Sequence, residues 1–167
     1  MRCTPQTVFQ QIDGLCQSAG QAAETVSLGL LRAIDDTVES LARARNMTKG
    51  LVKVTRALTQ SIHTCDENTL DADEATCGQL EVAEAALSST LHMLTYKRLY
   101  AVRDPKLNDH HEDAVVDAYD QTIEIISHLH DAIIDLRWAV MEHDADLESP
   151  TGEPVDNVSD LMTRLQA

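Results

Sequence analysis

The residue types best suited to chemistry are acidic side chains that recur in one stretch of the chain at steps of three, four and seven residues. They are Asp113, Asp117, Asp120, Glu124, Asp131 and Asp135. On an α-helix these steps place side chains along one side, and carboxylates stacked in this way can bind Mg²⁺, which takes oxygen ligands in octahedral geometry. Earlier in the chain, Glu81 and Glu84 are spaced three apart and could supply the facing half of the site. The sequence therefore contains a candidate Mg²⁺ site on two helices.

These two acidic motifs resemble those of the all-α nucleotide pyrophosphohydrolases of the MazG type, whose paired acidic motifs bind the metal for attack on a nucleoside triphosphate. The likeness covers two helices. Glu81-Val-Ala-Glu84 lacks the doubled glutamate in front of the family's motif, and Asp117-Ala-Tyr-Asp120 stands where the family has Glu-x-x-Asp. The resemblance implies a Mg²⁺-dependent hydrolase whose pocket is lined by these four acids and Glu124. The alternative, which we favour, is a solvated helix face opposite a buried stripe.

Histidine gives a second candidate for a metal site. Glu124 and His128 are spaced four apart, which places a carboxylate and an imidazole on one helix face. Di-iron bundles use Glu-x-x-His instead, because that spacing aims both groups at a shared centre, and the motif is absent from this sequence. The sequence also lacks Gly-x-Ser-x-Gly, a Walker loop, a dinucleotide-binding fingerprint and His-Glu-x-x-His. We therefore name no catalytic residue, expect no bound cofactor, and keep Mg²⁺ as the alternative.

The acids belong to the helix that the sequence defines best, over residues 109–145. Apolar positions recur there at alternating steps of four and three, which is a heptad seam. The heptad seam consists of Val115, Tyr119, Thr122, Ile126, Leu129, Ile133, Leu136 and Val140. Neighbouring helices must cover most of these side chains, which predicts a bundle with crossing angles of roughly +20°. One short bundle often cannot cover such a long apolar edge completely, so the seam also predicts a homodimer in which a second copy covers the remainder.

Hydrophobic periodicity and helix-ending residues divide the rest of the chain into further helices. Gly14 and Gly20 predict a short or broken first helix, and residues 46–50 indicate a tight connection between two helices. Asp104-Pro105 is expected to end the helix at 72–102, because the residue before a proline avoids helical backbone angles. The expected helices are 5–18, 21–45, 48–63, 72–102, 109–145 and 155–165. The predicted fold class is all-α: an antiparallel up-and-down helical bundle with four main helices and shorter N- and C-terminal helices.

Composition supports a single helical domain, the bundle of residues 1–147. Aromatic residues make up 3% of the 167 residues, so the core must be aliphatic, which suits helix-on-helix packing. No run approaches the ~20 apolar residues of a membrane span, and the first residues lack the hydrophobic stretch of a signal peptide, which predicts a cytoplasmic protein. The four cysteines contain no C-x-x-C pair and are expected to be reduced thiols. The one disulfide to consider joins Cys65 and Cys77 across an acidic loop.

Charge limits the possible partners. The formal net charge of −15 repels the phosphates of nucleic acids, so binding of DNA or RNA is disfavoured, and the acidity favours either a basic protein partner or solubility alone. Residues 40–65 contain no acidic side chain, and Lys49, Lys53 and Arg56 form a basic stripe at helical spacing. We expect this basic part to pair with the acidic 109–145 helix, within one bundle or across a dimer.

Residues 148–167 are predicted to be a linker followed by a short helix. Proline and glycine mark the linker at 148–154, and residues 155–165 carry an amphipathic pattern. The apolar positions of this pattern are Val155, Val158, Leu161, Met162 and Leu165. The segment resembles the clasp-helix ends of bacterial antitoxins, in which a linker delivers a short apolar helix to a partner's groove. A helix so short must dock to be stable, and we favour its own bundle or a sister subunit as the surface.

Two functions follow as hypotheses. The leading one is a non-enzymatic, acidic helical module for protein interaction or regulation, with the character of an antitoxin, an immunity protein or a nucleic-acid mimic. The alternative is a Mg²⁺-dependent nucleoside triphosphate pyrophosphohydrolase. Acids that converge in a pocket would favour the enzyme, whereas acids spread over a convex surface would favour the module.

Overall fold

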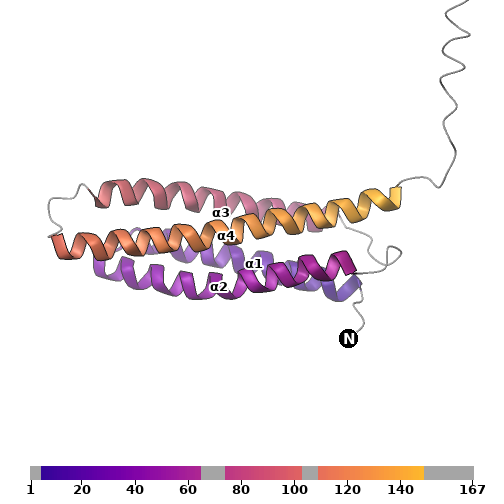
Figure 1. The fold of residues 1–167 in the computed structure, drawn as a ribbon, viewed down its shortest axis with the longest axis horizontal. Coiled ribbons are helices and arrows are strands. Elements are labelled where there is room, and N and C mark those ends of the chain that lie inside the picture. The colour runs from indigo at the N-terminus through magenta and orange to yellow at the C-terminus, as the bar shows by residue number, and fades with distance from the viewer. Residues whose placement is uncertain (1–4, 65–73, 103–108, 149–167) are drawn as a thin grey trace, which may run out of the picture.

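The structure is a computed structural model that describes residues 5–64, 74–102 and 109–148, and these form four α-helices (Figure 1). The helices are α1 Pro5–Gly29, α2 Ile34–Thr64, α3 Glu74–Ala101 and α4 Asp109–Glu148. The described residues contain no β-strand, and the helices pack on one another, which confirms the predicted all-α helical bundle. No helix in this part of the chain combines the length and the apolar character needed to cross a membrane.

Each helix packs on two others, so the four close a ring in the order α1, α2, α4, α3. The ion pairs of Arg98 with Asp120 and of Arg137 with Glu84 show that α3 and α4 run in opposite directions. In contrast, α2 and α4 lie side by side and run the same way (Figure 1). The described backbones of α2 and α3 do not approach each other closely, so these consecutive helices lie diagonally across the bundle. The order of the helices around the bundle therefore differs from their order along the chain.

The helix breaks predicted in the first half of the chain are wrong. Gly14 and Gly20 lie inside α1, and Gly50 lies inside α2. A Cβ atom at any of the three would meet no neighbouring atom within 4 Å, and glycine costs a helix only about 1 kcal/mol relative to alanine. Burial of the apolar sides of α1 and α2 outweighs that cost. Two helices therefore replace the three that were predicted at 5–18, 21–45 and 48–63.

The chain reverses instead at residues 30–33, between α1 and α2. Gly29 is buried there, and a Cβ atom on it would lie 2.6 Å from the Cβ atom of Ser40. The hydroxyl of Thr37 is within hydrogen-bonding distance of the carbonyl oxygens of Gly29 and Ala33, at 3.0 Å from each. The turn is therefore fixed by a close approach of two helices, which the missing side chain of glycine permits.

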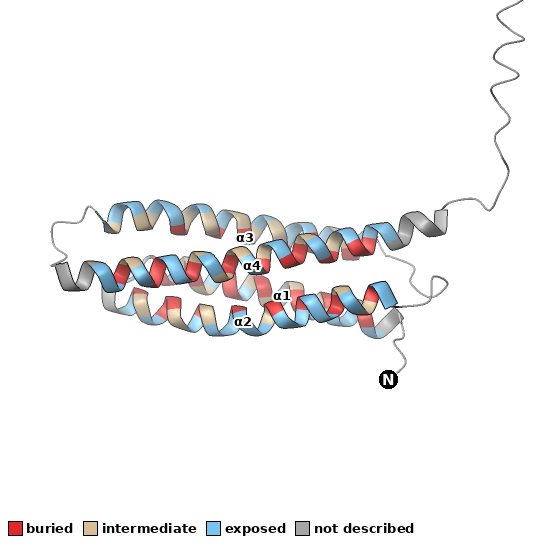
Figure 2. Cartoon of the chain, in the orientation of Figure 1, coloured by how far each residue is buried: buried red, intermediate tan, exposed pale blue. Residues whose placement is uncertain are grey.

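The heptad seam lies at the centre of the core, as predicted. Its eight side chains are each at most 6% exposed. Figure 2 shows the buried residues on the sides of the helices that face the interior of the bundle. Because α2 and α3 both pack on α4, one chain covers the whole seam. The seam therefore needs no second copy for its burial.

Several core positions hold threonine in place of an aliphatic residue. The hydroxyls of Thr48, Thr55 and Thr122 donate to the carbonyl oxygens four residues earlier, at 2.6–2.7 Å. This bond satisfies the buried hydroxyl within its own helix. These three buried hydroxyls are therefore engaged within α2 and α4.

Some predictions concern residues outside the described part of the chain. They are the disulfide partner Cys65, the acidic loop that follows it, most of the linker and the amphipathic segment 155–165.

Candidate functional site

Exposed carboxylates lie along the outer side of α4, and five of them are together named the acidic face. They are Asp113, Asp117, Glu124, Asp131 and Asp135. Asp117, Glu124 and Asp131 recur every seven residues, close to two helical turns, so they form one line along the helix. In the described part of the chain no lysine or arginine pairs with any of the five, and Asp131 lies 3.5 Å from the imidazole of His130. The acidic face is therefore largely unneutralised.

Trp138 continues the line of the acidic face. It follows Asp131 by seven residues and is 55% exposed, and Met141 beside it is exposed as well. Sequence reasoning missed this tryptophan. The heptad numbering was the signal that could have found it, because it places Trp138 on the side of α4 opposite the seam.

Asp120, a predicted Mg²⁺ ligand, is bound by an arginine of α3. Arg98 donates from Nε to one carboxylate oxygen and from Nη2 to the other, the second bond being 2.8 Å long. These hydrogen bonds hold the pKa of the Asp120 carboxyl below its ordinary value. Both oxygens of this carboxylate are therefore engaged within the chain.

Replacing Arg98 with glutamine is expected to raise the pKa of Asp120 towards its ordinary value, because two charge-assisted hydrogen bonds are lost. A lowered carboxyl pKa contributes stability above the ordinary pKa, and that contribution is lost as the pH falls through the pKa of the folded state. A carbon-13 NMR titration of the carboxyl measures the pKa. Arg43→Gln, which removes a surface pair with Glu39, is the control. An Asp120 pKa that is equal in both variants would contradict this assignment.

Glu81 and Glu84 meet an arginine rather than the acids of α4. Arg137 Nη1 donates to Glu84 at 2.6 Å, and Nη2 of the same guanidinium lies 3.7 Å from Glu81. Arg137 follows Asp120 by 17 residues on α4, a distance of about 25 Å at the rise of an α-helix. Glu84 therefore lies far from Asp120 along the bundle.

The remaining candidate ligands do not converge either. Glu124 and His128 are both exposed, one turn apart on the outside of α4. Over the residues that the structure describes, no group of three or more His, Cys, Asp or Glu side chains is placed to hold a metal ion. The exposed acids of α4 lie spread along the outer side of the helix.

The basic stripe also faces outward. Lys49, Lys53 and Arg56 are exposed on α2, the neighbour of α4. Arg45 donates a hydrogen bond to Gln121, but between the described parts of α2 and α4 there is no ion pair. A basic and an acidic surface therefore lie on adjacent helices without direct pairing between them.

Comparison with known proteins adds no family to this description. No protein-family model matches the chain, and no curated protein or solved structure matches it significantly.

Proposed function

We propose that this protein is a non-enzymatic interaction module that binds a basic, amphipathic segment of a partner protein on the acidic face of α4. The observation that carries the proposal is the exposed Trp138 at the end of a line of carboxylates that no lysine or arginine of the described chain neutralises. Tryptophan is enriched among the residues that dominate binding energy, and surface charge selects the partner and speeds association. An exposed tryptophan beside unneutralised carboxylates is the combination expected of a surface that binds another protein.

The chemistry of the partner follows from the same residues. A lysine or arginine can lie over the indole ring of Trp138, an interaction of about 0.5–2 kcal/mol. Further basic side chains at helical spacing would meet Glu124 and Asp131, and apolar ones would pack on Met141. Nucleic acid does not fit, because its phosphates are repelled by these carboxylates.

One surface of this kind belongs to the chain itself. The outer face of α2 presents Lys49, Lys53 and Arg56, with an exposed Val54 among them. In a symmetric dimer, α4 of each copy would meet α2 of the other, giving two identical contacts. The proposal includes this homodimer as the case in which the partner is a second copy.

Trp138 is the single tryptophan of the chain, so its fluorescence reports directly on this face. At low salt, a synthetic amphipathic helix of lysine and leucine is expected to shift the emission to shorter wavelength, and added salt should weaken the binding. A peptide of glutamate and leucine of the same length should leave the emission unchanged. If the partner is a second copy, the emission of the chain alone shifts with protein concentration.

Substitutions locate the binding on the acidic face. Together, Asp117→Asn, Glu124→Gln and Asp131→Asn are expected to weaken binding of the lysine peptide about tenfold, since three exposed charge contacts are lost. The control variant changes the net charge equally through exposed acids of the other helices. It combines Glu24→Gln, Asp36→Asn and Glu74→Gln. Equal weakening by both triple variants would reveal a bulk charge effect and contradict the proposal, as would an emission that the lysine peptide does not change.

A further inference from the structure

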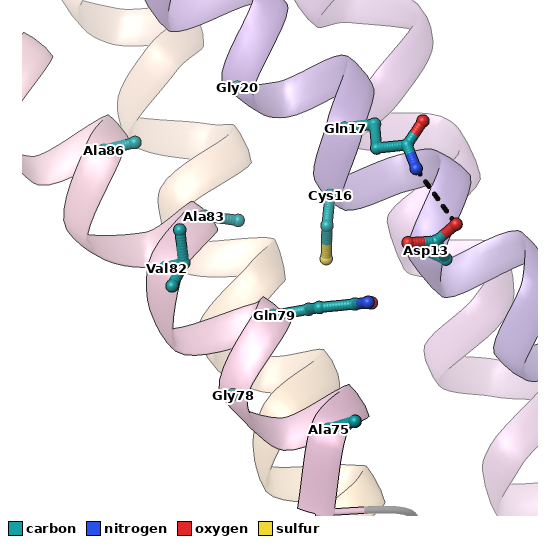
Figure 3. Close-up of a pocket in the computed structure, with 10 residues that line it drawn as sticks. All are labelled: Asp13, Cys16, Gln17, Gly20, Ala75, Gly78, Gln79, Val82, Ala83 and Ala86. Carbon is teal, nitrogen blue, oxygen red and sulfur yellow. Dashed lines mark hydrogen bonds between the residues drawn. The ribbon is translucent and has the colours of Figure 1, made fainter.

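A groove of about 640 Å³ opens between α1 and α3 (Figure 3). Small residues line most of it, namely Cys16 and Gly20 of α1 and Ala75, Gly78, Ala83 and Ala86 of α3. A Cβ atom on either glycine would meet no neighbour within 4 Å, so the side chains of the two helices do not fill the space between them. Val82 at the edge of the groove is 71% exposed. The groove is therefore an apolar surface that the four helices leave uncovered.

Cys16 lies inside this groove. Figure 3 shows its sulfur directed into the space between the two helices, towards Gln79. Burial, and to a smaller extent the charge of Asp13, raise the pKa of the thiol from 9.0 to about 11. At neutral pH the reactive thiolate is therefore rarer than for an ordinary thiol. The rate at which a thiol reagent labels Cys16 can therefore report whether the groove is open.

The C-terminal end of α4 lies near the mouth of the groove. Arg137 is opposite Glu84. Because α3 and α4 run in opposite directions, the position ten residues after Arg137 on α4 is level with Glu74, at the start of α3. The groove begins at the next residue of α3, Ala75. Figure 1 likewise shows α4 ending at the end of the bundle where α1 begins. The residues after Glu148 therefore start at this end of the bundle, with α3 between them and the groove.

The lengths of the following segments fit the groove. Residues 149–154 can span up to about 20 Å, enough to cross α3, which is about 10 Å wide. Residues 155–165 would form a helix about 16 Å long, and the eleven-residue step from Ala75 to Ala86 is also about 16 Å. The predicted apolar stripe supplies the large side chains that the groove lacks. These are Val155, Val158, Leu161, Met162 and Leu165.

We infer that residues 155–165 bind in the groove between α1 and α3 of their own chain as an amphipathic helix, entering beside Ala75 and running towards Ala86. Burial of their apolar side chains against the small residues of the groove drives the docking, at about 25 cal/mol per Å². The short tether gives an effective concentration of the order of mM, which favours the groove of the same chain over that of a second copy. This docking uses no residue of the acidic face and is independent of the proposed function.

In the full chain, Leu161→Asp is expected to raise the rate at which N-ethylmaleimide labels Cys16 about tenfold, because a charge on the apolar stripe expels the segment and opens the groove. Peptide mass spectrometry reads the labelling of Cys16 separately from that of the other three cysteines. Thr163→Asp is the matched control, since it adds the same charge on the opposite side of the predicted helix. This control should label Cys16 at the rate of the unchanged chain.

Two outcomes would overturn the inference. Equal labelling rates in Leu161→Asp, Thr163→Asp and the unchanged chain would mean that the segment does not cover Cys16. Protection of Cys16 that increases with protein concentration would mean that the groove is filled by a second copy. Circular dichroism of both variants verifies that the four helices are intact.

Discussion

Replacing Leu129 with alanine is expected to lower the free energy of unfolding by about 2–5 kcal/mol. The side chain of Leu129 is 0% exposed in the middle of the heptad seam, on the helix that packs on both α2 and α3. Its removal leaves a cavity, and helices held by their other contacts collapse around such a cavity only in part. Urea unfolding followed by circular dichroism measures the change.

The matched control on the same helix is Trp138→Ala. It removes a larger side chain, but one that is 55% exposed, so we expect a change within about 0.5 kcal/mol. The loss in Leu129→Ala should not depend on protein concentration, because one chain covers the seam. A difference between Leu129→Ala and the unchanged chain that varies with protein concentration would instead place the seam between two copies and contradict the structure.

The element that sequence predicted best is α4, and the reason is physical. Its apolar positions keep one period over the whole helix, from Val115 to Val140, so the buried side follows from helix geometry alone. The same period places the acids of α4 outward, and the structure has Asp117, Glu124 and Asp131 exposed as that numbering implies. Local pattern was sufficient here because the same side of α4 faces the neighbouring helices along the whole seam.

The boundary between α1 and α2 could not be predicted in this way. Each of Gly14, Gly20 and Gly50 has the propensity to end a helix, yet the break comes after Gly29. What distinguishes Gly29 is a tertiary contact, the close approach of Ser40 from the next helix. Helix propensity cannot detect such a contact, because it assigns the same value to all four glycines.

The candidate site, too, was predicted only in the part that depends on local sequence. The sequence identified Glu84 and Asp120 as carboxylates worth attention, but their partners are Arg137 and Arg98, 53 and 22 residues away. Such pairs depend on which helices become neighbours, and the diagonal placement of α2 and α3 does not follow from periodicity. The groove between α1 and α3 was missed for the same reason, because it exists only where small residues of two helices face each other.

The Gly29→Ala variant tests the contact that fixes the turn. We expect it to lower the free energy of unfolding by about 1–3 kcal/mol, because the new methyl group would lie 2.6 Å from Ser40 Cβ. That atom is attached directly to the backbone of α2, so it cannot rotate away, and the two helix ends must separate. The separation also strains the hydrogen bond from Thr37 to the carbonyl oxygen of Gly29.

Gly14→Ala is the matched control, since it makes the same chemical change inside the same helix. A Cβ atom at Gly14 would meet no neighbour within 4 Å, so the variant should gain about 0.5–1 kcal/mol from better helix propensity. Opposite signs for the two substitutions in urea unfolding would show that packing against Ser40, rather than helix propensity, decides where α1 ends. A stabilised Gly29→Ala variant would contradict the close approach, because a methyl group can stabilise only where there is room for it.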